Sequence, residues 1–308
     1  MFSKYRGELI LFFVTLIAAS GWFFSKFSLR EFPPMGFMGG RFLTATLIYL
    51  PFAYPQIKKL SIKQITNACL VGFCYTIYLI LWLLGLLNSQ YFGEGAFLVS
   101  LSMLVVPIMS WLFFKDKPMN IFWVSLPLAI LGLYLLSLSK GGVSLSLGNL
   151  IFLLSSISAA IYFVLNNRFA HNIPALPLTT LQVAVVGVCC TAYSFFFEDF
   201  PENISSESWF WFIASLLIAT NLRMLLQTIG QKYCQVSNAA MIMLLEPVWT
   251  LILSMMILGE QLDWIKSFGC LCILMALVIY RLPKSLIKKS DLAKKIARSD
   301  HLSHQSLK

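Results

Sequence analysis

Residues 72–118 read GFCYTIYLILWLLGLLNSQYFGEGAFLVSLSMLVVPIMSWLFFKDKP, and residues 217–263 read LIATNLRMLLQTIGQKYCQVSNAAMIMLLEPVWTLILSMMILGEQLD. A shift of about 145 positions places Gly85 on Gly230 and Ala96 near Ala240. The same shift brings the Phe114-Lys115-Asp116 exit near Leu258-Gly259-Glu260. A repeated run of apolar helices is typical of secondary transporters, which are often built from two related halves.

The composition predicts a protein that crosses a membrane many times. Of 308 residues, 58% are hydrophobic and 12% are charged, and a single soluble core could not bury so much apolar surface. A spanning helix needs about 20 mostly apolar residues. Ten windows meet this requirement: 8–27, 35–55, 65–87, 92–114, 119–139, 148–167, 176–197, 208–230, 236–258 and 263–282. Because these runs are continuous rather than alternating, the predicted fold is an all-α polytopic membrane protein of ten transmembrane helices.

The ten predicted helices divide into two halves of five. The predicted domains are a first repeat at residues 1–141, a second at residues 142–282, and a basic tail at residues 283–308. Because five is odd, the second half enters the membrane from the opposite side, and the two repeats are inverted relative to each other. In this architecture the substrate site lies between the repeats near the membrane midplane, and rocking of the halves exposes it to each side in turn.

The distribution of charge predicts the orientation. The formal net charge is +10, but the basic residues gather at helix ends and in the tail, which does not indicate nucleic acid. With the N-terminus inside, the cytoplasmic side receives the tail and Lys4, Arg6, Lys58, Lys59, Lys63, Lys115, Lys117, Arg168 and Lys232. The outer side receives Arg30, Lys140 and Lys266, with the acidic residues Glu198, Asp199, Glu202 and Glu207. This asymmetry predicts that both termini are cytoplasmic and that membrane lipids are partners.

The sequence gives no sign of a metal site or cofactor. The seven cysteines lie in or beside apolar spans, and no pair has the spacing of a zinc or redox site. The histidines His171, His301 and His304 fall in predicted loops or the tail. No Gly-rich phosphate loop occurs in the sequence, which argues against ATP-driven pumping. We expect no cofactor, and a monomer or weak dimer.

Several short segments recur in the order that one transporter family uses. The first half contains Ser20-Gly21-Trp22, Gly39-Gly40-Arg41-Phe42, Gly85-Leu86, Ala96-Phe97-Leu98-Val99-Ser100-Leu101 and Val106-Pro107. The second half contains Gly148-Asn149-Leu150, Leu245-Glu246-Pro247-Val248 and Leu258-Gly259-Glu260-Gln261-Leu262. Across almost the whole chain, these segments resemble the EamA-type members of the drug/metabolite transporter superfamily.

The chain departs from this family pattern at Lys115-Asp116, where Gly-Glu is common, and at Asn149, where an acidic residue is frequent. Both departures weaken any role carried over to those positions and leave the fold assignment intact. The resemblance implies a ten-helix carrier of the bacterial inner membrane that moves a small metabolite, often outward, through a central cavity.

Ionisable residues inside the predicted spans are candidates for the substrate site, because a charge within a membrane is costly. Arg223 lies well inside the eighth span, with Gln227 one turn later on the same face. The repeat shift places Tyr78 on Arg223 and Trp82 on Gln227. Glu246 lies near the middle of the ninth span, just before a proline. An aromatic face on the third span would thus oppose a cationic and amide face on the eighth.

These residue types predict how a substrate is held. Arg223 would receive an anionic group such as a carboxylate, and Glu246 would pair with an ammonium or take up a proton for coupling. The apolar or aromatic body of the substrate would contact four aromatic side chains, Trp22, Tyr78, Trp82 and Tyr162. In the alternative interpretation, Arg223 and Glu246 only neutralise each other as a buried ion pair.

A second charged pair is a candidate outer gate. Arg41 and Glu94 lie close to the predicted outer ends of the second and fourth spans. They would close the cavity from outside or form a purely structural salt bridge. Lys26 and Arg168, at helix ends, are expected to extend to lipid headgroups.

The predicted function is secondary transport, most simply export, of a small metabolite such as an amino acid or a related amphipathic compound. Protons are the candidate coupling ion. The alternative is a polytopic membrane enzyme that acts on a lipid-linked or small polar substrate. Such enzymes generally need clustered Asp, Glu or His at a membrane face, and no two acids stand close together in a predicted cytoplasmic loop. We therefore expect a transporter and not an enzyme.

Overall fold

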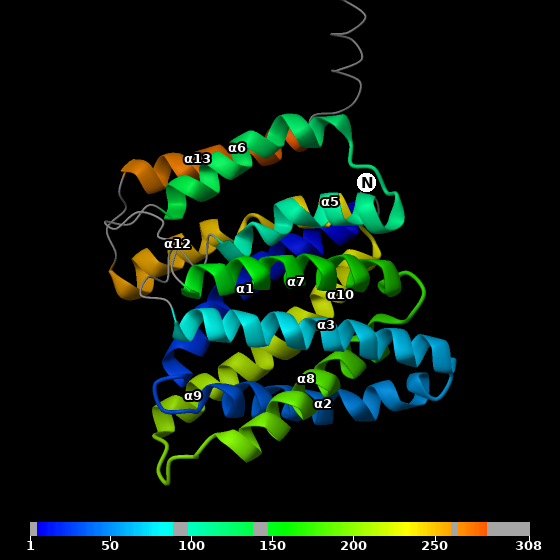
Figure 1. Cartoon of the computed structure of the whole chain (residues 1–308), viewed down its shortest axis with the longest axis vertical. Coiled ribbons are helices and arrows are strands. Elements are labelled where there is room, and N and C mark those ends of the chain that lie inside the picture. Colours follow the sequence, from blue (N-terminus) through cyan, green and yellow to red (C-terminus); the bar gives the residue numbers. More distant parts are fainter. Residues whose placement is uncertain (1–4, 89–97, 138–146, 260–263, 282–308) are drawn as a thin grey trace, which may run out of the picture.

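The computed structural model describes residues 5–88, 98–137, 147–259 and 264–281, and these segments fold into helices with no strand among them (Figure 1). The α-helices are α1 (Arg6–Ser28), α2 (Pro34–Ile57), α3 (Ile62–Leu87), α5 (Ser102–Phe114), α6 (Asn120–Ser137), α7 (Leu147–Ala170), α8 (Ala175–Phe197), α9 (Ser206–Ala214), α10 (Arg223–Lys232), α11 (Val236–Met243), α12 (Glu246–Leu258) and α13 (Trp264–Arg281). Between α9 and α10 the stretch η2 (Ser215–Leu222) is a π-helix.

Many of these helices have the length and composition of membrane spans. Six described stretches are long and apolar enough to cross a membrane: Arg6–Ser28, Ile62–Gly85, Leu147–Ala170, Ala175–Phe197, Ser206–Lys232 and Val236–Ile257. Three shorter apolar helices are Leu98–Phe114, Asn120–Leu135 and Ser267–Tyr280. The sequence prediction of an all-helical polytopic membrane protein is therefore confirmed. The number of ten helices and their arrangement in two repeats stay predictions.

The eighth and ninth predicted spans are each interrupted. Residues 208–230 pass through α9, η2 and α10, and the π-helix ends immediately before Arg223. Residues 236–258 form α11 and α12, which are separated by a turn at residues 244–245. Pro247 has no N–H to donate to the carbonyl of Met243, and α11 ends at Met243. Interruptions of this kind inside a membrane occur where neighbouring protein or a cavity satisfies the backbone.

Helices from distant parts of the chain pack directly against each other. The main pairs are α2 with α8, α3 with α7, α6 with α13, α3 with α8 and α1 with α10 (Figure 1). In the first pair, a Cβ added to Gly39 would lie 2.6 Å from the backbone nitrogen of Thr191. A Cβ added to Gly187 would lie 2.7 Å from the backbone nitrogen of Leu43. Because no side chain fits at either position, these glycines set the spacing between α2 and α8.

The C-cap residue of α8, Glu198, also caps the first turn of α2. The Glu198 carboxylate accepts hydrogen bonds from the backbone N–H groups of Met35 at 2.9 Å and Gly36 at 2.7 Å. N–H groups in a first turn have no partner within their own helix, and a carboxylate there complements the helix dipole. We expect Glu198→Ala to lower the free energy of unfolding by about 1–2 kcal/mol, as the loss of a strong helix cap does.

Thermal melts of purified variants in one detergent measure this effect. Glu202→Ala is the matched control, because Glu202 is an exposed acid of the same loop. An equal loss of stability in both variants would contradict the capping role of Glu198.

Candidate functional site

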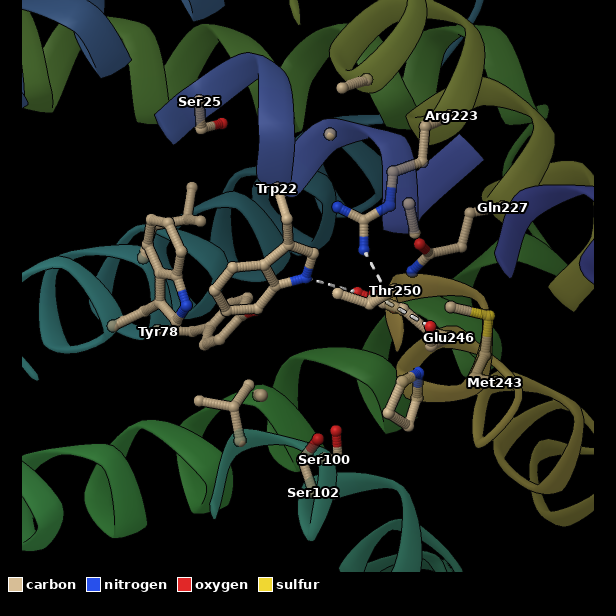
Figure 2. A pocket seen from close by; sticks show the side chains of 18 of the residues that line it. Trp22, Ser25, Tyr78, Ser100, Ser102, Arg223, Gln227, Met243, Glu246 and Thr250 are labelled. Carbon is tan, nitrogen blue, oxygen red and sulfur yellow. Dashed lines mark hydrogen bonds and ion pairs between the residues drawn. The ribbon is translucent and has the colours of Figure 1, made fainter. Parts of the chain in front are cut away.

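A cavity of about 310 Å³ lies between helices of both halves of the chain (Figure 2). Its wall contains all seven side chains predicted to bind substrate, namely Trp22, Tyr78, Trp82, Tyr162, Arg223, Gln227 and Glu246. They come from α1, α3, α7, α10 and α12. The structure thus brings the predicted residues into one site, and their role in binding stays a prediction.

An ion pair forms the polar centre of the cavity. Arg223 Nη2 lies 3.8 Å from Glu246 Oε2, and Trp22 Nε1 donates a hydrogen bond of 3.1 Å to Glu246 Oε1 (Figure 2). Glu246 is the first residue of α12, where the positive end of the helix dipole favours a carboxylate. The side chains of Arg223 and Glu246 are 26% and 21% exposed, so both are reached from the cavity. Both oxygens of Glu246 therefore have partners before any substrate arrives.

An aromatic wall stands beside this pair. The rings of Tyr75 and Tyr162 stack with centroids 4.3 Å apart, and Tyr78 lies 5.9 Å from Tyr75. Trp22 and Trp82 meet edge to face at 5.2 Å. Tyr75 lines the cavity but is missing from the sequence prediction. Tyr75 lies three residues before Tyr78 and seven before Trp82, so all three share one helical face. This spacing in the sequence could have identified Tyr75.

Several polar atoms of the cavity wall are buried without a hydrogen-bond partner among the described residues. They are Trp82 Nε1, Tyr162 Oη, Gln227 Oε1 and Arg223 Nε. Buried polar atoms in folded proteins nearly always have partners, and an unsatisfied one costs free energy. Their grouping around one cavity indicates that a bound molecule or water completes these bonds.

Two further cations line the cavity. Arg41 and Lys26 both belong to its wall, and the extension of Lys26 to lipid headgroups stays a prediction. Glu94, the expected partner of Arg41 in an outer gate, lies outside the described residues, and the gate stays a prediction. Arg41 is buried, with 7% of its surface exposed.

Trp249, a deep aromatic residue, belongs to a different contact. Its Nε1 donates a hydrogen bond of 3.1 Å to Thr15 Oγ1, and its ring packs edge to face on Phe12 at 5.8 Å. It is not among the residues that line the cavity. Trp249 therefore packs α12 against α1.

Packed apolar side chains fill the bundle on the side of Arg6, beyond the cavity. We call them the apolar plug: Leu11, Val14, Val106, Phe163, Val164, Ala239, Ala240 and Met243, from α1, α5, α7 and α11. All eight are buried. The cavity wall and the plug meet at Phe163 and Met243, which belong to both.

A cluster of buried amides lies at the same end of the bundle, and we call it the amide cluster. Gln182 Nε2 donates to Asn166 Oδ1 at 2.7 Å, and Asn166 Nδ2 donates to Gln231 Oε1. Asn167 Nδ2 donates to the carbonyl oxygens of Gln231 and Cys234 at 2.8 and 3.1 Å. These bonds join α7, α8 and α10.

Comparison with known proteins identifies the family. A family model described as the EamA-like transporter family matches the chain twice, over residues 5–138 and 146–282. The chain belongs to the EamA-like transporter family. This membership confirms the resemblance drawn from the sequence and makes the chain a transporter of the drug/metabolite type.

Two relatives resemble this EamA-like transporter along most of its length. An uncharacterized transporter of Archaeoglobus fulgidus is 26% identical over 276 residues, which cover 90% of this chain and 86% of the relative. The uncharacterized transporter YvbV of Bacillus subtilis is 25% identical over 286 residues, which cover 90% of this chain and 92% of the relative. A solved crystal structure is 16% identical in sequence to this chain and shares its fold, with a TM-score of 0.74. The match covers 91% of this chain and 98% of the chain in that structure.

Proposed function

We propose that this chain is a secondary transporter with ten transmembrane helices in two inverted repeats, and that it exports a small amphipathic metabolite by alternating access. The observation that carries the proposal is the Arg223–Glu246 pair, which faces an aromatic wall in a cavity between the two halves. Ionisable groups inside a membrane are rare and typically belong to a transport pathway. The substrate carboxylate would bind Arg223 in place of Glu246, and Glu246 would then take up the coupling proton.

Helix packing supports the inverted repeat. The contact of α1 with α10 has a counterpart in the contact of α7 with α3, as expected if α7 and α3 repeat α1 and α10. Glycine contacts follow the same rule, because a Cβ on Gly85 would meet Phe152 of α7 at 2.8 Å and one on Gly230 would meet Leu11 of α1 at 2.7 Å. Both α5 and α12 have 13 residues and end at a left-handed residue, Lys115 and Gly259 respectively.

A basic hollow supports the proposed orientation in the bacterial inner membrane, with both termini in the cytoplasm. A space of about 410 Å³ near the end of α5 is lined by residues that include Lys115, Lys117, Arg168 and His171. Burial, with the neighbouring Arg168 and Lys232 cations, lowers the pKa of His171, so this imidazole is neutral at pH 7. Clustered lysine and arginine side chains favour the cytoplasmic side of a membrane.

In the proposed transport cycle, the apolar plug and the amide cluster form the closed side of the cavity. Both lie toward the cytoplasmic ends of α7 and α10 in this orientation, where they would close the cavity toward the cytoplasm. Uptake of substrate from the cytoplasm then requires that α7 separate from α10 and that Asn167 release its two carbonyl partners. A rocking motion of one half against the other would achieve this.

Tyr75 provides a test of the aromatic wall. We expect Tyr75→Leu to weaken the binding of aromatic substrates about 2- to 10-fold, because the cavity wall loses the ring of Tyr75 and the support that this ring gives to Tyr162. Tyr75→Phe keeps the ring and is the matched control. Isothermal titration of the purified variants measures the difference, and equal affinities for both variants would contradict a stacking role.

The decisive experiment is flux through reconstituted protein. Purified protein is first screened by thermal shift against amino acids and small aromatic carboxylates. Each ligand that raises the melting temperature is then followed across proteoliposome membranes with and without a pH gradient. We expect saturable flux of unchanged ligand, accelerated by the gradient. Ligands that bind without crossing, together with chemical conversion of a lipid or small molecule, would instead favour the membrane enzyme.

A further inference from the structure

The cavity contains a second guanidinium group whose described contacts are all neutral. Arg41 Nη1 donates hydrogen bonds to Ser215 Oγ at 2.7 Å and Ser25 Oγ at 3.3 Å. The guanidinium carbon lies 4.8 Å from the ring centre of Phe37 and 5.1 Å from that of Phe42. Two hydroxyls and two rings from α1, α2 and η2 thus hold the group in one position without neutralising its charge.

One edge of the Arg41 guanidinium makes almost no hydrogen bonds with the described residues. Arg41 Nε is buried and has no hydrogen-bond partner in the described parts of the chain. Nη2 donates only to the sulfur of Met38 at 3.2 Å, and a thioether is a weak acceptor. Nε and Nη2 form the side of arginine that binds a carboxylate through two parallel hydrogen bonds. The side of Arg41 that has no oxygen partner among the residues that the structure describes is therefore the one that an acidic group recognises.

The two guanidinium groups flank a common aromatic surface. Phe42, which packs on Arg41, meets Tyr75 edge to face at 5.8 Å, and Tyr75 stacks on Tyr162. Tyr75 lies within electrostatic range of both Arg41 and Arg223. A molecule lying on this surface would therefore have a cation toward each end.

The charges of the cavity wall do not balance. Among its described residues that are not exposed, Arg41 and Arg223 are cationic and only Glu246 is anionic, whereas Lys26 is exposed. Both oxygens of Glu246 are already engaged, by Trp22 and Arg223. An uncompensated buried charge is costly, so a ligand that brings additional negative charge is favoured over a neutral one.

We propose that the cavity takes an organic dianion, with one acidic group at Arg223 and a second at the Nε–Nη2 side of Arg41. The inference rests on the proposed function and narrows its substrate class to compounds with two acidic groups on a small apolar or aromatic body. Arg41 then determines specificity, because it separates a diacid from the corresponding monoacid.

Matched probes test this directly. Phenylsuccinate and its monoamide have the same size and differ by one negative charge, as do glutamate and glutamine. We expect the wild-type protein to bind the more acidic member of a pair about 10- to 100-fold more tightly in titrations of the full chain. Arg41→Gln should remove this preference while retaining affinity for the monoamide, and Arg41→Lys should retain part of it. Arg223→Gln should weaken both members.

The competing explanation is that Arg41 only neutralises Glu94, its predicted partner from the sequence. If Arg41 serves only to balance Glu94, then Arg41→Gln with Glu94→Gln will restore wild-type selectivity and stability, and the inference fails. Equal wild-type affinity for both members of the pairs overturns it as well, as does an unchanged preference in Arg41→Gln. Diacids that bind but do not cross proteoliposome membranes would refute transport and leave the dianion site standing. Flux of neutral or cationic compounds alone would refute the dianion site and leave transport standing.

Discussion

Replacing Arg223 with glutamine is expected to abolish transport while the protein still folds. Glutamine keeps a polar side chain but removes the cation that lies 3.8 Å from Glu246 and that would receive the substrate carboxylate. Loss of a desolvated charged contact between a protein and its ligand costs about 2–5 kcal/mol of binding free energy, which corresponds to a fall in substrate affinity of about 30-fold or more. Proteoliposome flux measures the loss, and a single symmetric peak in size-exclusion chromatography verifies folding in detergent.

A double variant separates substrate binding from simple charge neutralisation. Arg223→Gln combined with Glu246→Gln removes both charges and therefore the penalty of an unpaired carboxylate. If the pair only neutralises itself, the double variant will regain both stability and transport. We expect it to regain stability alone, because the group that holds the substrate is still missing. Wild-type flux in the single variant would refute the role of Arg223 outright.

Adding one methyl group to Gly39 is expected to destabilise the protein. The new Cβ would lie 2.6 Å from the Thr191 backbone nitrogen and 2.8 Å from its Cα, and backbone atoms cannot move aside as a flexible side chain can. Gly39→Ala should therefore push α2 and α8 apart and cost about 1–3 kcal/mol of stability, although alanine is the better helix former.

Gly40 supplies the control one residue away. A Cβ on Gly40 would meet Phe212 at 3.6 Å, an ordinary contact distance. Gly40→Ala should leave the melting temperature unchanged or raise it, whereas Gly39→Ala should lower it. Thermal melts followed by intrinsic fluorescence compare the two, and similar melting temperatures would show that α2 and α8 tolerate a wider spacing than the structure has.

Hydropathy predicted the helical segments well because the membrane demands long apolar helices. The window 148–167 became α7, which runs from Leu147 to Ala170. The π-helix before Arg223 could not be predicted, because its extra residue per turn depends on the packing around it. The break before Glu246 was signalled by Pro247, which stands in the middle of the predicted ninth span.

The site was predictable where a polar residue stood out against an apolar span. Arg223, Gln227 and Glu246 were found in this way, and the repeat shift added Tyr78 and Trp82. Two features of the cavity wall were not predicted from the sequence, the presence of Tyr75 and that of Arg41. Tyr75 resembles an ordinary core residue until its ring is seen on Tyr162, and the sequence pairs Arg41 with Glu94 rather than with the cavity. The spacing of Tyr75 from Tyr78 and Trp82 indicated which face of the helix it shares, but only contacts between distant helices place Tyr75 and Arg41 on the cavity wall.

The apolar plug also affects how well the membrane holds its gradients. A sodium ion or proton that entered the cavity would meet Leu11, Val14 and Phe163 next, and none of these side chains can replace its water. Moving an unpaired charge through such a layer costs tens of kcal/mol. We expect no conductance above the lipid baseline when the protein is held in planar bilayers without substrate, and a steady current would contradict this. A cell can thus keep many copies of such a carrier in its membrane without leakage of the ions that store its energy.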